Sequence, residues 1–305
     1  MSTKISIIIP HKNSSNLLER CLSTIPEKEY IQVIIVDDNS DSNIVNFNKF
    51  PGINRKNTQV VFNKKSGGAG RARNIGLNFV QGEWILFADA DDFFTNKFEE
   101  LINKYIASKA DVVYFAVDSV YSSNIKKEAN RDKKLKGFIE KYNLRANLKN
   151  ENDLRYGFTE PWAKLIKTNL IVHNKITFDE TSVSNDYWFS VLIGYHANII
   201  EVESNSLYVV THRNDSLTNS EQDIEKLKIR IEISSRVYLF LKLNNINYEE
   251  PFTKQWLWIL LKINVFSFFS TYFSLLKKDK AFLPMLFKTL LHGYNQFLLR
   301  LQKYI

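Results

Sequence analysis

The sequence predicts an α/β fold followed by a helical C-terminal extension. Over the first 120 residues, short runs of β-branched and aromatic residues alternate with stretches of helical character. That alternation is typical of a parallel sheet whose strands are connected by covering helices. From about Asp223 a helical pattern continues to the end of the sequence. We therefore predict a sheet domain over residues 1–220 and a helical, aromatic and basic extension over residues 221–305.

Five strands are predicted from short apolar runs, at residues 5–9, 32–36, 59–62, 84–88 and 112–117. Helices are predicted between them at residues 17–25, 71–80 and 97–108. Residues 122–153 are polar and rich in Lys and Asn, so we predict a mobile excursion rather than core. Residues 198–202 and 207–211 are predicted to form a pair of strands.

The charge of the chain is unevenly distributed. The formal net charge is +8. From Trp256 to the end there are seven basic residues and one acid, Asp279, so this tail carries +6 and the preceding 255 residues carry +2. The asymmetry predicts that one end of the molecule meets an anionic surface. Nucleic acid is not the expected partner, because the sequence contains no recognised nucleic-acid-binding module.

The composition is that of an ordinary globular protein, with 44% apolar and 24% charged residues. The single cysteine, Cys21, excludes an internal disulfide, and its place in an apolar helical stripe predicts core packing. The apolar run at residues 5–9 is too short for a secretory signal and is expected to be a buried strand. These features together favour a reducing, cytoplasmic location.

Three of the five predicted strands end in distinctive polar groups. These are Pro10-His11-Lys12-Asn13, Asp37-Asp38-Asn39-Ser40-Asp41 and Asp89-Ala90-Asp91-Asp92. Ligands of such sheets bind beyond the carboxyl ends of the strands. Two carboxylates at positions i and i+2 suit a hard divalent cation that also holds a phosphate. The alternative is an acidic turn before the next helix, with Thr95 as its N-cap.

These segments also occur in a characteristic order along the chain. Ile7-Ile8-Ile9-Pro10 is followed by Val36-Asp37-Asp38-Asn39-Ser40-Asp41, then Ala72-Arg73-Asn74-Ile75-Gly76-Leu77, then Gly82-Glu83-Trp84-Ile85 and Asp89-Ala90-Asp91-Asp92. Over residues 4–218 the chain resembles the family 2 inverting glycosyltransferases of bacterial polysaccharide synthesis. The resemblance implies the GT-A fold, a Rossmann-like mixed sheet flanked by helices.

The resemblance also implies which residues bind the donor nucleotide. Pro10 and Asp38 would bind the nucleotide, with Asp38 accepting a hydrogen bond from the base and Asp37 supporting the turn. Arg73 would lie near the phosphates, and Asp89 would face the ribose. The alternative for Arg73 is a structural ion pair at the start of a helix.

Asp89 and Asp91 match the family's Asp-x-Asp motif, in which the second carboxylate ligates a Mn²⁺ or Mg²⁺ ion that bridges the donor diphosphate. Asp92 would share the metal or hold the loop. His212 would be a third ligand, with an ordinary hydrogen-bonded histidine as the alternative, and Arg213 would contact phosphate. The cation is needed because the nucleoside diphosphate departs with developing negative charge.

The acceptor side of the reaction needs a base that takes a proton from a hydroxyl group. The resemblance implies that this base is Asp186, although Asn185 replaces the glutamate that usually precedes it. An amide carries no charge, so we expect any raising of the base's pKa by that neighbour to be lost. The alternative for Asp186 is a helix cap. Trp162 would stack on the acceptor sugar or, alternatively, be a buried structural residue.

The strongly apolar stretch at residues 255–276 is not expected to span a membrane. Lys262 opposes insertion by about 2.5–3.5 kcal/mol, whereas each Leu, Ile or Phe returns only about 0.3–0.6 kcal/mol. Its polar residues recur at three- and four-residue steps, which predicts a helix with a narrow polar stripe and a broad apolar face. Together with the lysines that follow, residues 255–305 are predicted to lie on an anionic membrane from the cytoplasmic side. Packing on the same chain or in a homodimer is the alternative.

The sequence therefore predicts a metal-dependent inverting glycosyltransferase that moves a hexose or N-acetylhexosamine from a nucleotide-diphosphate donor, with UDP favoured, to a glycan or lipid-linked acceptor. A nucleotidyltransferase would need a phosphate-cradling signature near the amino terminus, where the chain has Pro10-His11-Lys12-Asn13. A catalytically silent subunit that anchors a polysaccharide assembly complex is the alternative from another class. A Rossmann oxidoreductase is disfavoured, because no Gly-x-Gly-x-x-Gly follows the first strand.

Overall fold

The computed structural model describes residues 3–212 and 223–301, with side chains up to Tyr294. The chain divides into two compact units, Met1–Asn214 and Asp215–Ile305. The predicted domain boundary between residues 220 and 221 lies outside the described residues.

The N-terminal unit is built on a mixed sheet, whose described strands follow the order β3-β2-β1-β4-β8-β6-β9-β5, with β7 added beside β6. The parallel part consists of β1 (Ile5–His11), β2 (Ile31–Asp37), β3 (Thr58–Phe62) and β4 (Trp84–Phe87). β8 (Lys164–Lys167) runs antiparallel between β4 and β6 (Val112–Tyr121), and β9 (Ile200–His212) is parallel to β6. The short strands are β5 (Phe93–Phe94), antiparallel to β9, and β7 (Asn124–Glu128), antiparallel to β6.

The central strands are buried on both faces of the sheet, as continuous apolar runs require. Every residue of β1, β2 and β4 is buried. The helices α1 (Ser15–Ser23), α2 (Gly68–Leu77) and α3 (Phe98–Tyr105) were predicted, with ends that differ by a few residues. Cys21 lies in the core on α1. Thr95 is not the N-cap of α3, because Lys97 holds that position and the Thr95 hydroxyl donates to Ser206 O at 2.7 Å.

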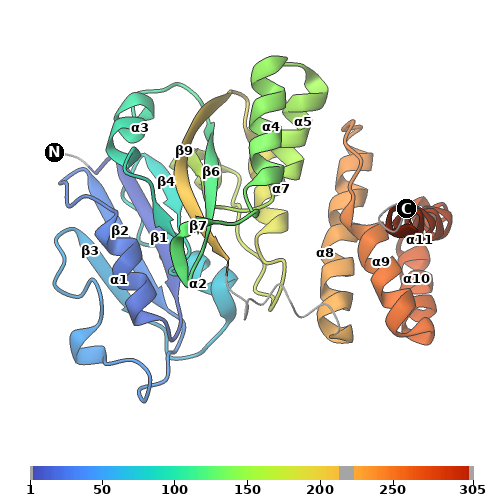
Figure 1. Ribbon diagram of the computed structural model, residues 1–305, viewed down its shortest axis with the longest axis horizontal. Helices are drawn as coiled ribbons and strands as arrows, with labels where there is room; N and C mark the ends of the chain where they lie inside the picture. Colours follow the sequence, from blue (N-terminus) through green and yellow to red (C-terminus); the bar gives the residue numbers. More distant parts are fainter. Residues whose placement is uncertain (1–2, 213–222, 302–305) are drawn as a thin grey trace. The chain divides into compact units, whose positions relative to one another are not determined.

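The prediction of a mobile excursion at residues 122–153 is wrong. This stretch forms β7 and the helices α4 (Lys133–Leu144) and α5 (Leu148–Gly157). α4 packs on β6, β9 and α5 (Figure 1), and α5 packs on α7 (Tyr187–His196). A few apolar side chains are enough for this packing, among them Leu135, Ile139 and Leu154, which are at most 2% exposed. The abundant Lys and Asn residues cover the outer faces and hide the pattern in the sequence.

The predicted pair of strands at residues 198–202 and 207–211 is also wrong, since residues 200–202 and 207–211 belong to the single strand β9. They pair in parallel with β6, and the register shifts between Phe115 and Val117. The polar residues Ser204 and Asn205 therefore form an irregularity within a strand rather than a turn between two strands.

The C-terminal unit is helical, with α8 (Ile224–Leu243), α9 (Phe252–Ile263), α10 (Val265–Lys278) and α11 (Met285–Leu301) in chain order. The single helix predicted at residues 255–276 is in fact two helices. Asn264 divides them, because its side chain caps α10 by accepting a hydrogen bond from Ser267 N at 2.8 Å. Among the described residues, none of the helices has the length and apolar character needed to cross a membrane.

Candidate functional site

The candidate site is built where β1, β2 and β4 end. His11 and Asp37 are register partners at the ends of β1 and β2. Their side chains are joined by a hydrogen bond of 2.8 Å between His11 Nδ1 and Asp37 Oδ1. His11 Nε2 accepts from Ser14 N at 3.1 Å, which assigns the proton to Nδ1. Pro10 is buried in β1 beside Val36.

Asp37 fixes the turn after β2. Its Oδ2 accepts from Ser40 N at 2.9 Å and its Oδ1 accepts from the Ser40 hydroxyl at 2.5 Å. Burial acts to raise the pKa of Asp37, but the hydrogen bonds from His11 and Ser40 outweigh it and hold the pKa below its usual value. The carboxylate is therefore ionised and structural, as predicted for its part in the turn.

Asp38 is buried and its two carboxylate oxygens hold the glycine-rich loop. Oδ2 accepts from the Ser66 hydroxyl at 2.7 Å and from Gly68 N at 2.9 Å, and Oδ1 accepts from Gly67 N at 2.8 Å. Lys12 Nζ lies 3.8 Å from Oδ2. For Asp38 to accept a bond from a nucleotide base, one of these loop donors has to move or the bond has to be shared.

Arg73 links three segments of the site. It is 4% exposed; its Nη2 lies 2.6 Å from Asp89 Oδ1, and its Nη1 donates to Asn185 Oδ1 at 2.9 Å. The guanidinium also lies 5.3 Å from the centre of the Phe178 ring. The structure thus contains the structural ion pair that was the alternative for Arg73. Because Arg73 also binds Asn185, it links the acidic end of β4 to residue 185.

Gly70 on α2 allows the segment at residues 179–185 to approach. A Cβ atom at this position would overlap the carbonyl oxygen of Asp179 and lie 3.0 Å from Asn185 Cβ. Asn74, one turn further along α2, donates to Phe178 O at 3.0 Å and accepts from Phe178 N at 2.8 Å. α2 and the segment before Asp186 are therefore in close backbone contact.

We expect Gly70→Ala to lower the free energy of unfolding by about 1–3 kcal/mol, because the added methyl group overpacks this contact. Gly137→Ala is the matched control, since a Cβ at Gly137 in α4 meets nothing within 4 Å. There the helix propensity of Ala should raise stability by about 0.5–1 kcal/mol. Chemical denaturation of both variants measures the difference, and equal stability would show that the close approach at Gly70 is not required.

Asp89, Asp91 and Asp92 form a three-carboxylate group after β4. One ligand atom from each lies within 4.8 Å of the others. Asp92 is 2% exposed, and it accepts from Thr211 N at 2.7 Å and from the Tyr208 hydroxyl at 3.0 Å. Burial, followed by the charges of Asp91 and Asp89, raises the pKa of Asp92 well above its usual value. Oxygen ligands with excess negative charge fit a hard divalent cation such as Mg²⁺ or Mn²⁺.

Three other residues hold this group and were not predicted. The Tyr208 hydroxyl accepts from Asp89 N at 2.8 Å, and the Thr211 hydroxyl donates to Asp91 O at 2.9 Å. Arg20 on α1 also donates to Asp91 O. Tyr208 and Thr211 lie in the buried run at residues 207–211 of β9, and their pairing with a loop about 120 residues away leaves no local signal in the sequence.

His212 and Trp162 lie outside the acidic group. Among the described residues, the group with metal-ligand spacing does not include His212, whose ring packs edge-on against Tyr121 at 5.3 Å. Trp162 is 4% exposed, and its indole stacks on Tyr208 at 5.3 Å. This packing favours the structural alternative for Trp162. Arg213 lies outside the described residues.

Asp186 stands at the N-cap position of α7, yet its side chain makes no capping hydrogen bond. Burial raises its pKa to about 6, which Arg73 opposes while Glu160 and Asp89 contribute to the increase. Asn185 cannot raise the pKa of Asp186, as expected. Burial and carboxylates from other segments raise it instead. A carboxylate with this pKa is suited to general base catalysis near neutral pH.

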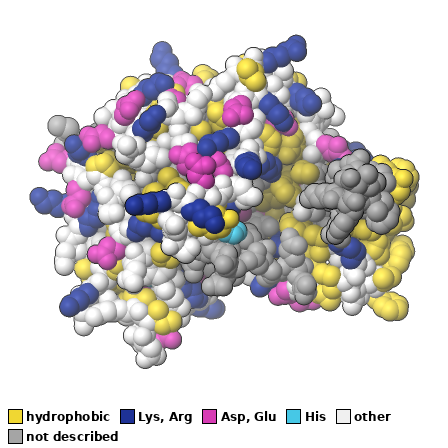
Figure 2. All heavy atoms as spheres, in the orientation of Figure 1, with side chains coloured by type: hydrophobic (Ala, Val, Ile, Leu, Met, Phe, Trp, Pro, Cys, Tyr) yellow, Lys and Arg dark blue, Asp and Glu magenta, His cyan; other side chains and the backbone are white. Residues whose placement is uncertain are grey.

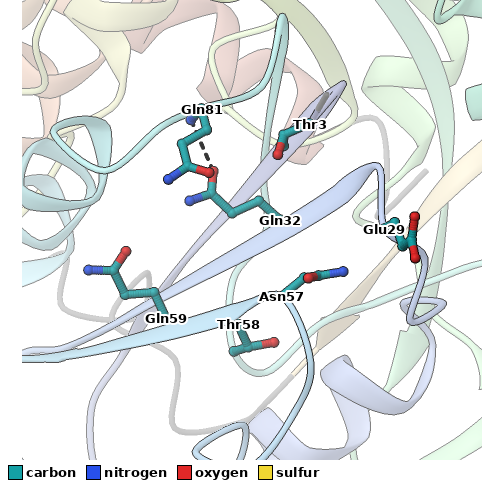
Figure 3. Close-up of a pocket in the computed structure, with 7 residues that line it drawn as sticks. All are labelled: Thr3, Glu29, Gln32, Asn57, Thr58, Gln59 and Gln81. Atoms are coloured by element: carbon teal, nitrogen blue, oxygen red, sulfur yellow. Dashed lines mark hydrogen bonds between the residues drawn. The ribbon is translucent and has the colours of Figure 1, made fainter. Parts of the chain in front are cut away.

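A polar pocket of about 210 Å³ lies at the opposite edge of the sheet, near the start of β2 and β3 (Figure 3). Its lining includes Gln32, Gln59 and Gln81, and Gln81 N donates to Gln32 Oε1 at 3.0 Å. It lies at the amino ends of the strands, away from the three-carboxylate group.

Comparison with protein families decides the family of the chain. The model described as "Glycosyl transferase family 2" matches residues 6–160, just over half of the sequence. The chain belongs to glycosyl transferase family 2. The match includes β1 to β4 and the three-carboxylate group, and it confirms the family that the sequence motifs predicted.

Several curated proteins with related sequences are named as glycosyltransferases. A poly(ribitol-phosphate) beta-glucosyltransferase of Bacillus spizizenii is 28% identical over 286 residues, which covers 80% of this chain and 41% of that protein. Glycosyltransferase GlyG of Streptococcus pneumoniae is 25% identical over 250 residues, covering 77% of this chain and 80% of GlyG. The chain thus spans less than half of the first relative and most of the second.

Solved structures confirm the predicted GT-A fold, a mixed sheet flanked by helices. The crystal structure of Staphylococcus aureus TarS 1–349 in complex with UDP-GlcNAc has a TM-score of 0.58 at 23% identity, covering 88% of this chain and 73% of that one. A mannosyltransferase of Pyrobaculum calidifontis in complex with GDP-Man and Mn²⁺ has a TM-score of 0.51 at 15% identity, covering 97% and 76%.

Proposed function

We propose that the protein is a metal-dependent inverting glycosyltransferase of surface polysaccharide synthesis, with a UDP-sugar as donor and a glycan or lipid-linked acceptor. The observation that carries the proposal is a divided site, in which Arg73 draws together the three-carboxylate group and the segment of Asp186. The UDP-GlcNAc bound in the TarS complex supports the choice of a UDP-sugar donor. The poly(ribitol-phosphate) in the name of the Bacillus relative supports a role in polysaccharide synthesis.

Asp91 and Asp92 would hold a Mn²⁺ or Mg²⁺ ion, with Asp89 beside them on the ribose side. When bound, the cation offsets the charge that develops on the diphosphate as the sugar–oxygen bond breaks. Pro10 and Asp38 border the proposed nucleotide site at the ends of β1 and β2. Arg73 would keep Asp89 oriented and add positive charge near the phosphates.

Asp186 would act as the base in a single displacement. The acceptor hydroxyl gives its proton to the carboxylate while its oxygen forms a bond to the anomeric carbon. The bond from that carbon to the diphosphate breaks, and its electron pair leaves with the nucleoside diphosphate. Attack on the face opposite to the leaving group inverts the anomeric configuration.

A panel of UDP-, GDP- and dTDP-sugars, each with Mn²⁺, Mg²⁺ or EDTA, tests the proposal. We expect metal-dependent release of UDP from one UDP-sugar above the background rate. If no nucleotide sugar is hydrolysed or transferred under any of these conditions, the protein is better described as a silent anchoring subunit.

We also propose that the C-terminal unit binds an anionic membrane at the cytoplasmic face. Phe266 is 89% exposed, and Phe287 and Leu283 are each 69% exposed. Figure 2 shows hydrophobic side chains gathered on the visible face of this unit. Lys277, Lys278, Lys280 and Lys288 belong to the same helices and the turn between them. Exposed aromatic side chains beside lysines match the interface of a bilayer that contains anionic lipid.

We expect Phe266→Ser combined with Phe287→Ser to weaken binding to vesicles of phosphatidylglycerol and phosphatidylcholine by at least about tenfold, because two large apolar side chains no longer enter the interface. Leu144→Ser is the matched control, since Leu144 is 86% exposed but lies in the N-terminal unit. Vesicle flotation measures the difference. Equal loss in both variants would contradict the proposal, and a concentration-dependent dimer without vesicle binding would assign this surface to a second copy of the chain.

A further inference from the structure

A strongly basic segment runs from β7 to the end of α4. Residues 124–145 contain eight Lys or Arg residues and three acids, so they carry a net charge of +5. The other residues before Trp256 carry −3 together. The positive charge of this part of the chain is therefore concentrated in one segment.

Most of the basic side chains in this segment face solvent. Lys136 is occupied by acids, since its Nζ lies 2.8 Å from Asp132 Oδ2 and 3.0 Å from Asp118 Oδ1. Five others are exposed and, among the described residues, form no ion pair with a carboxylate. We call these five residues the basic track: Lys126, Lys127, Arg131, Lys133 and Lys141.

Arg131 places the basic track beside the three-carboxylate group. Its Nη1 donates to Thr211 O at 2.7 Å. Thr211 in turn donates from its backbone N to Asp92 Oδ1 at 2.7 Å and from its hydroxyl to Asp91 O at 2.9 Å. A single residue of β9 therefore separates the Arg131 guanidinium from the proposed metal site.

The basic track extends from Arg131 along two elements. β7 runs antiparallel beside β6 (Figure 1), and Lys127 Nζ on β7 lies 4.9 Å from the centre of the Tyr121 ring. α4 packs on β6 and β9, and its 12 residues cover about 18 Å at 1.5 Å per residue. The charges are thus spread over a length much greater than that of one phosphate group.

The basic track lies on the side of the fold that carries the proposed base. α4 packs on α5, and α5 packs on α7, the helix that begins after Asp186. The proposed donor residues lie instead at the ends of β1, β2 and β4 and on α2. A ligand that lies along α4 is therefore better placed to be the acceptor than the donor.

The charge of the basic track fits a polyanion. Lysine and arginine side chains that lie close together repel one another, and each is stabilised when a phosphate or carboxylate group lies beside it. Separated positive charges suit a chain whose negative groups repeat along its length. An anionic membrane fits less well, because the exposed large apolar side chains described in this segment, Ile125 and Leu144, lie on different elements and form no apolar patch.

We propose that the acceptor is a polymer with repeated phosphate or carboxylate groups, and that the basic track binds this polymer beside the site. The inference rests on the proposed function, because it takes the bound polymer to be the acceptor of the sugar. The positive charge of the track also offsets the repulsion that the three-carboxylate group exerts on an anionic acceptor.

The test is the binding of fluorescently labelled polyphosphate, oligogalacturonate and dextran, measured by anisotropy without divalent cations. We expect the wild type to bind at least one of the two anionic polymers, with an affinity that falls as NaCl is added, and not to bind neutral dextran. The anionic polymer that binds more tightly identifies the charged group of the acceptor. Lys126→Gln combined with Lys133→Gln and Lys141→Gln should weaken this binding by about tenfold, because three exposed charge pairs are lost.

Lys49→Gln combined with Lys56→Gln and Lys109→Gln is the matched control, since it removes the same charge from exposed lysines outside the basic track. This control should bind the anionic polymers as the wild type does. Unweakened binding by the track variant overturns the inference, and so does an equal loss in the control. If the track variant loses binding to phosphatidylglycerol vesicles but not to the polymers, the basic track belongs to a membrane surface and the inference is wrong.

Kinetics separate this inference from the proposed function. In the track variant, the KM for an anionic acceptor should rise about tenfold, while the metal-dependent release of UDP from the donor alone stays at the wild-type rate. Wild-type release of UDP together with an unchanged acceptor KM overturns the inference and leaves the proposed function intact. A wild-type protein that binds the polymers through the track but cleaves no nucleotide sugar overturns the proposed function instead.

Discussion

Asp186→Asn should reduce transfer to the acceptor by about 10²–10⁴-fold while the Kd for the donor nucleotide stays within about twofold of the wild type, because a general base contributes to the rate by that factor. The amide is nearly isosteric and cannot accept the proton. Initial rates of transfer and calorimetric titration with UDP and Mn²⁺ measure the two effects separately. Transfer at the wild-type rate would remove Asp186 from the chemistry.

The same residue sets the expected pH dependence. The pKa of Asp186 is raised to about 6, so the carboxylate is ionised above that pH and protonated below it. Transfer by the wild type should therefore fall as the pH is lowered through about 6. An acid limb well below this value would mean that the burial of Asp186 is relieved in solution.

Asp186 also makes the stability of the fold depend on pH. Its folded-state pKa lies above the unfolded value, so the folded state disfavours ionisation and loses stability as the pH rises from the unfolded pKa through about 6. Asp186→Asn should therefore have a higher Tm than the wild type at pH 8. That advantage should be small near pH 4, where the carboxyl is protonated in the folded protein and about half protonated in the unfolded chain. Scanning calorimetry at the two pH values measures the change.

Asp91→Asn should lower metal-dependent transfer by at least about a thousandfold, because the metal supplies several kcal/mol of charge stabilisation in the transition state. The effect of the substitution on metal binding can be measured without enzymatic turnover. Mn²⁺ with UDP at about 100 times its Kd should stabilise the wild type by about 2.7 kcal/mol, and most of this gain should be absent in the variant.

Asp41→Asn is the matched control for Asp91→Asn. Asp41 is an exposed acid in the turn after β2 and lies outside the three-carboxylate group. The Asp41→Asn variant should retain both the thermal shift with Mn²⁺ and UDP and the wild-type rate of transfer. An undiminished thermal shift in Asp91→Asn would place the metal elsewhere.

The parts of the fold that the sequence predicts are those with strong local patterns. β1, β2 and β4 are continuous apolar runs because both faces are covered, and their polar ends meet at one edge of the sheet. The three-carboxylate group could be predicted because all its members follow a single strand. α4 and α5 could not be predicted, since only a few buried residues mark them within a lysine-rich stretch.

The remaining parts of the site depend on contacts between distant segments. Arg73 and Asn185 are 112 residues apart, and their hydrogen bond follows from the close approach that Gly70 permits. The loop bonds to Asp38 and the effect of Glu160 on Asp186 are likewise products of tertiary packing. The sequence indicates residue types that are suited to the chemistry, whereas the tertiary fold determines the environment of each residue.

In the proposed mechanism, one carboxylate group holds the metal and the diphosphate while a separate carboxylate takes the proton. The most direct measurement is anomalous diffraction at the manganese edge from crystals of the protein grown with UDP and Mn²⁺. We expect a single strong peak within about 2.0–2.4 Å of a carboxylate oxygen of Asp91 and of the UDP phosphates, with Asp186 outside the coordination shell. A peak coordinated by Asp186, or a UDP complex that binds no metal at Asp91, would overturn this division of roles.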